Sequence, residues 1–494
     1  MLFQCFVIVP LLFGIFYLYS KYKLSYWQRR GVQVPVSSNL IFGNFTDTLT
    51  FKKPPGKVLQ DIYESVNSEP YVGFYIFHKP ILMIRDLKLI KQIMVKDFDI
   101  FSNRRFGGDY EIDSVGLINL LSIHQPGWKY LRSKMTPSLS GLKLKRMVPL
   151  MTNCTIPLVD FIERTKINDD GWKEFELKEI SSRYTTDIIS SIAFGISTNS
   201  FDEKNDEFWR AGQRILTGFK RGIVFLIFFF IPNLIGFVKP FCTEPADFFR
   251  KVFWNSMNSR EKLGTKRGDL IDSFLTLKNG EQSSDFKFED DNLLGQALSF
   301  YIAGLEAVSS AIAFSLYELS RHTEYQSQLF EEIKIHLDNE ELTLESINKM
   351  ELLDQVVNET LRLYPPLPMI DRIASKNYKL PGTDLIIEKN TPIYVSINGT
   401  NRDPRYFNNP DEFNPLRSKS AMQEISSSSL AFGLGPRSCI GQRIGQIMTK
   451  VAIITILKKY KLSHKTKDDN LFSSINVFTT AADGVHVQFK NRKD

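Results

Sequence analysis

The sequence predicts one mainly α-helical domain with small peripheral β-sheets, preceded by an N-terminal membrane anchor. Three observations indicate the helical domain. Residues 291–322 form a long, mostly apolar stretch that is typical of a core helix. An amphipathic helix is expected to begin at Gly441, after glycine-rich turn chemistry. Residues 71–75 and 80–84 are rich in β-branched and aromatic side chains, as in a small sheet.

The composition excludes several classes of protein. The chain has 494 residues, of which 43% are hydrophobic and 24% charged, as in a globular protein with an ample core. The net charge is +7, but the basic residues are scattered, which favours a membrane surface or an acidic protein partner over nucleic acid. The four cysteines, Cys5, Cys154, Cys242 and Cys439, have no paired spacing, so we expect neither a disulfide framework nor a zinc site.

The N-terminal segment is the candidate anchor. Residues 2–20 carry no charge, and about 20 apolar residues suffice to cross a bilayer. A cleaved signal peptide is the alternative, but the segment lacks a basic start and a small-residue cleavage site. Four basic residues follow between positions 21 and 30, which places the remainder on the cytosolic side. We therefore expect an anchor over 1–20, a basic hinge linker over 21–40 and one domain over 41–494.

One cysteine stands out because of its surroundings. Cys439 lies in the decapeptide 432–441, Phe-Gly-Leu-Gly-Pro-Arg-Ser-Cys-Ile-Gly. Unpaired N–H groups and the dipole at a helix N-terminus lower the pKa of a cysteine and favour its thiolate. Gly433 and Gly435 allow a tight loop, and Gly441 lets a large flat group approach the backbone. A small buried hydrophobe is the alternative for a single cysteine, but this pattern is too dense for it.

This decapeptide resembles the haem-binding signature of the cytochrome P450 family, the haem-thiolate monooxygenases, in which the cysteine is the axial iron ligand. Phe432, both glycines, Arg437, Cys439 and Gly441 fall at the spacing of the family. The resemblance implies the cytochrome P450 fold, with haem b held between the long helix and the cysteine loop. It also implies that Cys439 is the metal ligand and that Phe432, Gly433, Arg437 and Gly441 help to bind the cofactor.

Three further residues match cofactor-binding positions of the family. Trp128 and Arg132 are one helical turn apart and share a face, which elsewhere indicates a surface pair. In the family this pairing supplies two donors to a haem propionate, and arginine suits a carboxylate partner. Arg372 falls where the family places another propionate donor. Asn401 stands where the family has histidine, which weakens one expected propionate contact.

The long helix contains the sequence Ala-Gly-Leu-Glu-Ala at 303–307. A mid-helix glycine costs about 1 kcal/mol relative to alanine, and a carboxylate on an apolar face must be paired or solvated. A solvated residue is the alternative for Glu306, which otherwise resembles the acid of the oxygen-binding motif of the family. Ala307 replaces the threonine whose hydroxyl helps to deliver protons to dioxygen. Ser310 lies one turn further on roughly the same face.

Glu359 and Arg362 place opposite charges at i and i+3 on one helical face. A surface ion pair is the ordinary interpretation, and such a pair contributes less than about 1 kcal/mol. The motif resembles the Glu-x-x-Arg of the family, whose pair joins a later arginine in a buried triad. That arginine matches Arg417.

Three other segments complete the pattern. Residues 183–195 are expected to be a core helix, similar to the E helix of the insect microsomal branch. Residues 223–231 are an apolar run too short to span a bilayer. The run is either a buried helix or a second membrane contact in the headgroup layer, and the resemblance favours the contact because the substrate entrance of the family lies there. Residues 475–484 match the last turn, which reaches into the substrate pocket.

The resemblance implies a monooxygenase that inserts one oxygen atom from O2 into an apolar small molecule. The electrons would come from NADPH through a membrane-bound reductase, with cytochrome b5 as a further partner and a location at the endoplasmic reticulum membrane. Two alternatives stay open. Ala307 is compatible with a haem-thiolate isomerase or a peroxide-dependent enzyme, and the cysteine signature argues against a non-catalytic binder of hydrophobic ligands.

Overall fold

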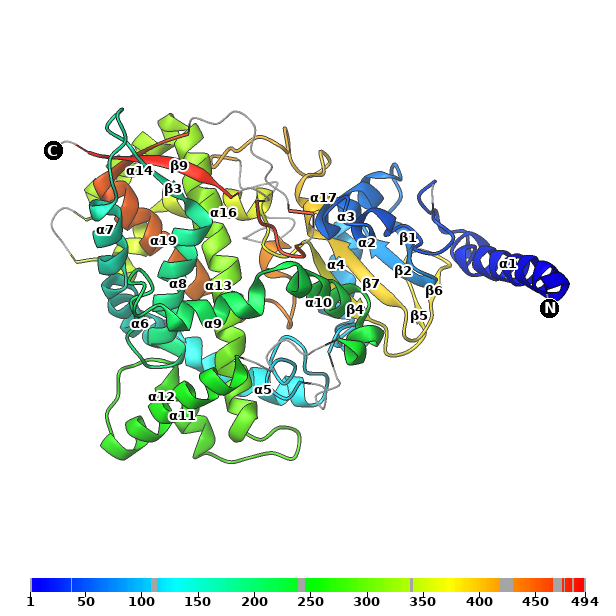
Figure 1. Cartoon of the computed structure of the whole chain (residues 1–494), viewed down its shortest axis with the longest axis horizontal. Coiled ribbons are helices and arrows are strands. Elements are labelled where there is room, and N and C mark those ends of the chain that lie inside the picture. The colour runs from blue at the N-terminus through cyan, green and yellow to red at the C-terminus, as the bar shows by residue number, and fades with distance from the viewer. Residues whose placement is uncertain are drawn as a thin grey trace.

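The computed structural model describes residues 2–36, 38–107, 113–238, 245–337, 341–417, 430–464, 473–474, 476–481 and 484–492, with side chains from residue 8 onward. Helices form most of the body, and a smaller part built around a β-sheet lies toward the N-terminus (Figure 1). The C-terminal strand lies at the opposite end of the molecule from helix α1. The mainly helical fold with small sheets is therefore confirmed.

The α-helices of the described residues are α1 (Leu2–Leu24), α2 (Thr46–Leu49), α3 (Pro55–Glu64), α4 (Leu87–Lys91), α5 (Gly127–Met135), α6 (Gly141–Asn153), α7 (Thr155–Arg164), α8 (Leu177–Ala193), α9 (Glu207–Leu216), α10 (Phe219–Phe230), α11 (Ala246–Leu263), α12 (Leu270–Lys278), α13 (Asp290–Arg321), α14 (Thr323–His336), α15 (Leu344–Lys349), α16 (Glu351–Leu363), α17 (Ile397–Asn401) and α19 (Gln442–Lys459). Short 3-10 or π turns are η1 (Gln28–Arg30), η2 (Gln92–Lys96), η3 (Thr136–Leu139), η4 (Pro232–Phe237) and η5 (Leu430–Phe432).

Three small sheets accompany the helices. The largest has the order β1 (Tyr71–Ile76), β2 (Lys79–Ile84), β7 (Pro392–Ser396) and β4 (Met369–Ile373), and its β2–β7 pair is parallel. The second has the order β3 (Lys173–Glu176), β9 (His486–Asn491) and β8 (Tyr460–Ser463). The third pairs β5 (Tyr378–Lys379) with β6 (Ile386–Ile387). Strands β1 and β2 confirm the strands expected at 71–75 and 80–84.

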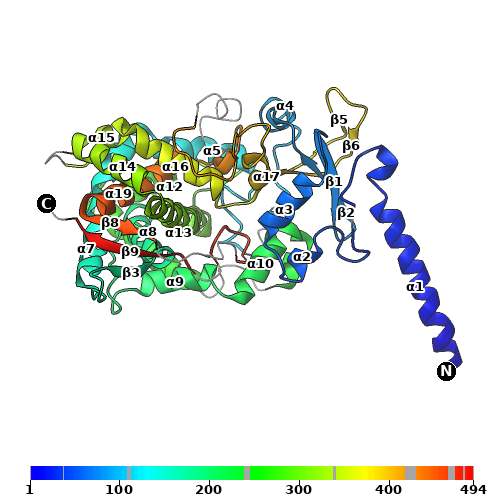
Figure 2. The same cartoon turned by 90° about the horizontal axis from the view of Figure 1, so that it is seen from above.

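Helix α13 is the central element of the helical body, and Figure 2 shows it almost end-on among the other helices. It packs against α8 and α19. Gly304 permits the close approach of α8, because a Cβ atom there would lie 2.1 Å from Cδ1 of Ile189. Among the described residues α13 is also the helix long and apolar enough to cross a membrane, but it is mostly buried within the protein. The apolar stretch at 291–322 is therefore a core helix, as predicted.

The N-terminal helix α1 projects from the body as a separate rod in both views (Figures 1 and 2). Its described part carries exposed apolar side chains, including Leu12, Phe13 and Leu18. The chain then turns back to the body at Trp27, which is buried against β1, where a Cβ atom on Gly73 would lie 2.3 Å from the indole. The backbone N–H of Trp27 donates to the hydroxyl of Tyr75 at 3.0 Å. Part of the segment 21–40 is therefore packed against the large sheet.

The apolar run at 223–231 lies mainly in α10 and is largely buried. Most of the run therefore packs into the body, while Ile223, Ile227 and Ile231 stay half-buried, and the contact of this segment with a membrane stays a prediction. Its phenylalanines pack inward, since Phe228 and Phe229 both have ring centroids 4.8 Å from that of Phe106. Exposed apolar side chains flank the run instead, at Phe219, Leu234 and Phe237.

Candidate functional site

The cysteine loop has the tight geometry that its glycines predicted. Gly433 and Gly435 have φ values of 73° and 75°. The loop is closed by the N–H of Cys439, which donates to the carbonyl of Phe432 at 2.8 Å. A Cβ atom on Gly435 would lie 2.1 Å from the carbonyl oxygen of Met94, so no other residue fits there. Helix α19 begins directly after Gly441, and the loop therefore presents Cys439 at a helix start.

Burial and positive charge act on the Cys439 thiol in opposite directions. Burial raises its pKa, whereas the backbone N–H of Gly441 and the charges of Arg132 and Arg104 oppose that shift. The expected lowering is therefore wrong for the free thiol, because the desolvation of the thiolate outweighs the helix start. The side chain is nevertheless exposed by surface area. We infer that the thiol faces a space inside the molecule, and a Cβ atom on Gly441 would meet its Sγ only at 3.8 Å.

The middle of α13 lies beside the cysteine loop. Gly445, one turn into α19, would place a Cβ atom 3.6 Å from Cγ2 of Val308. In this part of α13, Ala303 is exposed, and Phe300 and Ala307 are among the half-buried residues. These three residues recur at helical spacing and form one stripe. The structure thus brings Ala307 and Cys439 to the same region.

Arg372 lies in β4 and is fully buried. Its Nη1 donates to the carbonyl of Asp371 at 2.7 Å, while Nε and Nη2 have no hydrogen-bond partner among the described residues. Burial, reinforced by the nearby charge of Arg104, lowers its pKa to about 9, so the guanidinium remains charged at neutral pH. A buried cation with two free donors requires an anionic partner.

Asp371 does not provide that partner, because its carboxylate is already engaged. Its Oδ1 lies 3.0 Å from Nη1 of Arg104, and its Oδ2 accepts from the N–H of Arg105 at 2.6 Å. Arg104 is a site residue that the sequence does not reveal. No motif marks it, and its closeness to Asp371 and Cys439 arises only in the fold.

Trp128, Arg132 and Arg437 also meet at the cysteine loop. Nη1 of Arg132 donates to the carbonyl of Ser438 at 2.9 Å. The Arg437 guanidinium lies 4.5 Å from the centre of the Trp128 ring. Arg437 also binds backbone carbonyls, with Nε 2.6 Å from Ser102 O and Nη2 2.8 Å from Ile123 O. It therefore joins the loop to the segment before α5.

Glu306 is buried and paired, so the alternative of a solvated carboxylate is wrong. Its Oε1 lies 3.0 Å from Nζ of Lys178, in the first turn of α8. The same ammonium group donates to the hydroxyls of Ser309 and Ser310 at 2.8 and 2.7 Å. Lys178 is a site residue that the sequence does not reveal, since nothing in the sequence places α8 beside α13 in this register.

Glu359, Arg362 and Arg417 form the expected triad. Nε and Nη2 of Arg362 donate to the two carboxylate oxygens of Glu359 at 2.9 and 2.8 Å, and Nε of Arg417 lies 2.8 Å from Oε1. Asn401 belongs to this cluster, because its Nδ2 donates to the carbonyl of Arg362 at 3.0 Å. The expectation that asparagine in place of histidine at position 401 weakens one propionate contact stays a prediction. The triad joins α16 to the segment that precedes the cysteine loop.

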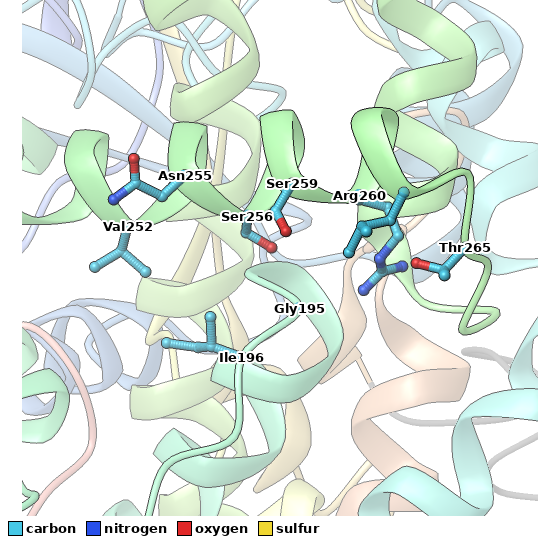
Figure 3. Close-up of a pocket in the computed structure, with 9 residues that line it drawn as sticks. Gly195, Ile196, Val252, Asn255, Ser256, Ser259, Arg260 and Thr265 are labelled. Carbon is cyan, nitrogen blue, oxygen red and sulfur yellow. The ribbon is translucent and has the colours of Figure 1, made fainter.

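A pocket of about 470 Å³ lies between α11 and the segment after α8, and Figure 3 shows polar side chains along its wall. Its charged residue, Arg260, is neutralised by Asp269 at 3.0 Å and Asp272 at 2.6 Å. None of the predicted site residues lines it. This pocket is therefore separate from the cysteine site.

A glycine-flanked cysteine at the start of a helix that packs against a long core helix is what a haem-thiolate monooxygenase requires. The family model described as cytochrome P450 matches residues 34–489. The chain belongs to the cytochrome P450 family and is a cytochrome P450 monooxygenase.

The proteins similar to this chain include insect members of this family. It is 38% identical over 482 residues to cytochrome P450 6k1 of Blattella germanica, with 92% of this chain and 90% of that protein covered. It is 34% identical over 507 residues to probable cytochrome P450 6g2 of Drosophila melanogaster, with 98% and 97% covered. Cytochrome P450 6l1 of Blattella germanica is 34% identical over 463 residues, with 92% and 90% covered.

The residues present fit the haem that the family implies. The interior-facing thiol of Cys439 is a suitable iron ligand, and metal coordination removes the proton that burial otherwise favours. The two free donors of Arg372 are suited to a propionate carboxylate, which would supply the missing anion. Arg104 and Arg132 add positive charge near the thiol.

Proposed function

We propose that this protein inserts one oxygen atom from O2 into an apolar small molecule, with electrons from NADPH delivered by a reductase. The observation that carries this proposal is the exposed thiol of Cys439 at the start of α19, the helix that packs against the part of α13 containing Ala307. When bound, thiolate-ligated haem supplies the chemistry of O–O cleavage. The protein would ligate iron through Cys439 and hold propionates through Arg372 and its neighbours. It would also exclude water and orient the substrate.

An aromatic cluster supports an apolar substrate. The ring of Phe478, in the segment matched to the last turn of the family, lies 5.4 Å from Phe225 and 6.2 Å from Phe229 of α10. Residues 475, 482 and 483 of that segment lie outside the described residues. Phe229 in turn contacts Phe106. Aromatic side chains with few polar groups among them favour apolar ligands, and we propose foreign compounds or lipid-like molecules as the class.

Ala307 motivates the second candidate function, a haem-thiolate isomerase or a peroxide-dependent enzyme. Such chemistry does not need protons delivered to dioxygen, so the absence of a hydroxyl at position 307 would not lower the activity. The buried and paired Glu306 favours the monooxygenase. Burying charged groups costs stability, and proton delivery to dioxygen would be a function that justifies this cost. A non-catalytic binder of hydrophobic ligands would not need the charged residues around the thiol.

We place the protein at the endoplasmic reticulum membrane, with residues 1–20 as a single-pass anchor, 21–40 as a linker and 41–494 as a cytosolic catalytic domain. The exposed apolar side chains of α1 support the anchor. The partners would be NADPH–cytochrome P450 reductase and cytochrome b5. Basic residues on the face of the cysteine loop would attract the acidic surface of such a partner.

Reconstitution with the reductase tests the proposal. Candidate substrates are first screened by the shift of the haem absorption band, and those that bind are incubated with NADPH and the reductase. We expect oxygenated product that depends on both. Product formed only with an organic hydroperoxide would establish the second candidate instead.

A further inference from the structure

The ammonium group of Lys178 is inserted among polar groups of α13 next to Ala307. Its Nζ lies 3.0 Å from the backbone carbonyl oxygen of Glu306 and 3.0 Å from Oε1 of the same residue. It also lies 2.8 Å from Oγ of Ser309 and 2.7 Å from Oγ of Ser310. One cation on α8 therefore contacts four oxygen atoms of a neighbouring helix.

These contacts lie just before and just after Ala307, the position of the missing hydroxyl, along α13. The bound carbonyl and carboxylate belong to Glu306, directly before Ala307, and the two hydroxyls follow it in the next turn of α13. The hydroxyl of Ser309 also donates to the carbonyls of Leu305 and Glu306. Every polar side chain of α13 between residues 305 and 310 is thus held in one network with Lys178.

Hydrogen bonds also hold the backbone of Lys178, at the start of α8, in place. Glu176 caps α8, since its Oε1 accepts from the N–H of Lys178 at 2.9 Å. The same oxygen accepts from the N–H of Val485 at 2.9 Å, which ties the start of α8 to the entry of β9. The side chain of Lys178 remains 25% exposed, compared with 11% for Glu306. Lys178 therefore links solvent to a buried part of α13.

We propose that Lys178 is a positioning residue for proton delivery, which holds Glu306 and Ser310 in place in a helix that has no hydroxyl at position 307. This proposal rests on the proposed function, because the reduction of dioxygen consumes protons and peroxide-driven chemistry does not. The ammonium group neutralises the buried carboxylate and orients the two serine hydroxyls. Without it, Glu306 is a buried, unpaired charge and turns toward other donors.

The test compares Lys178→Met with the wild type in the full-length enzyme with reductase, NADPH and a substrate that binds. Methionine keeps the length of the side chain and removes the charge. We expect the ratio of released hydrogen peroxide to product to rise about tenfold, which is about 1.4 kcal/mol in the partition between the two outcomes. Lys178→Arg should recover part of the coupling, because guanidinium restores the charge and the donors.

Lys143→Met is the matched control. It removes a lysine–serine bond of similar length, from Nζ to Oγ of Ser273 at 2.8 Å, between α6 and α12. We expect this variant to couple like the wild type. Equal uncoupling in both variants would overturn the proposal, because the effect would then come from general loosening of the fold.

A second measurement does not depend on turnover. The thermal unfolding of Lys178→Met, Glu306→Gln and the double variant forms a cycle that isolates the interaction between the two residues. We expect the double variant to be more stable than the sum of the single effects predicts. Additive effects, or wild-type coupling in Lys178→Met, would overturn the role of Lys178. If the wild type itself turned over only with hydroperoxide, the proposed function would be the part that fails.

Discussion

At the scale of single residues, positive charge is concentrated around one thiol. Arg104 and Arg132 both lower the pKa of Cys439, but burial has the larger effect, and the free thiol is held in its protonated form. Coordination to a metal ion reverses this balance, because the ion stabilises the thiolate directly. The cationic environment therefore becomes fully effective only when the cysteine is a ligand.

The first residue-scale prediction concerns ligation by Cys439. The reduced wild type should show the red-shifted carbon monoxide band of thiolate-ligated haem, and Cys439→Ala and Cys439→His should both lack it. Absorption spectra of the reduced, carbon monoxide-treated proteins measure this. Cys154→Ala is the control and should keep the band, since Cys154 lies between α6 and α7 and burial raises its pKa to about 12. The band in a Cys439 variant would refute the ligand assignment.

Replacing Arg372 is predicted to raise the stability of the haem-free protein and to lower the retention of haem. Its buried charge lacks an anion in the protein alone, so Arg372→Met should raise the unfolding temperature of the haem-free protein. The same variant should lose haem more easily, because a propionate would lose two donors. Since the pKa of Arg372 is about 9, both effects should be constant between about pH 6 and about pH 8.

Thermal unfolding of the haem-free protein and haem transfer to apomyoglobin measure these two quantities. Arg85→Met is the control, because Arg85 is also buried but donates to the carbonyls of Asn67 and Glu69. It should leave haem retention unchanged. Unaltered haem retention in Arg372→Met would remove Arg372 from the cofactor site.

At the scale of elements, α8 contributes to the site through three of its positions. Lys178 reaches α13 from the first turn, and Ile189 lies against Gly304. Asp187 fixes the segment that follows the helix, because its Oδ1 accepts from the hydroxyls of Thr198 and Ser200 at 2.8 and 2.7 Å. The position of Lys178 therefore depends on how well both ends of α8 are held.

The buried carboxyl group of Asp187 in α8 makes the stability of the folded protein dependent on pH. Burial raises its pKa from 3.8 to about 6, against the hydrogen bonds from Ser200 and Thr198. A raised folded-state pKa adds stability that is fully present below the unfolded-state value and is lost as the pH rises through about 6. The loss is roughly 3 kcal/mol, since each pKa unit corresponds to about 1.4 kcal/mol.

Asp187→Asn should therefore remove this pH dependence. Relative to the variant, the wild type should lose stability between about pH 4 and about pH 6 and show a constant difference above that range. Thermal unfolding followed by circular dichroism across this range measures the difference. Parallel curves for the two proteins would show that Asp187 stays ionised in the folded state throughout.

The triad acts at the same scale. Arg362 is fully buried, and its guanidinium also binds the carbonyls of Asn401, Pro410 and Glu412. Breaking a buried pair by removing one partner costs about 3 to 5 kcal/mol. A loss of that size is comparable to the whole stability of many domains. We therefore interpret the triad as structural support for the segment that leads to the cysteine loop.

At the scale of the whole molecule, α1 and η4 present exposed apolar side chains outside the body. Phe237 in η4 is 86% exposed, and Leu234 is 41% exposed. The end of α1 is attached to the β1–β2 turn, where Oγ of Ser20 lies 3.1 Å from Nε2 of His78. The direction of α1 relative to the large sheet is therefore set by contacts. Two separate apolar surfaces are available to a membrane.

Deletion of residues 2–20 should leave a folded haem protein that still binds membranes weakly. Adding Leu234→Ser and Phe237→Ser should abolish the remaining binding, because the exposed apolar area of η4 is then lost. Sedimentation with liposomes at low and high salt measures both steps. Full solubility of the deletion protein at low salt would mean that η4 makes no membrane contact.

The sequence alone determined the features that depend on local spacing. The glycines around Cys439 predicted the tight loop, and the length and apolar character of 291–322 predicted the core helix. Glu359 and Arg362 meet because residues three apart share a helical face. Such features are predictable because the backbone repeat of one element fixes which side chains are neighbours.

Only the tertiary structure decided what lies across from these elements. Lys178 and Glu306 are 128 positions apart, and Arg104 and Asp371 are 267 apart, so no periodicity relates them. The sequence could not show that the run at 223–231 packs inward, because an apolar run suits a core and a membrane surface equally well. It also overestimated the effect of the helix start on Cys439, because desolvation depends on all the elements that surround the thiol.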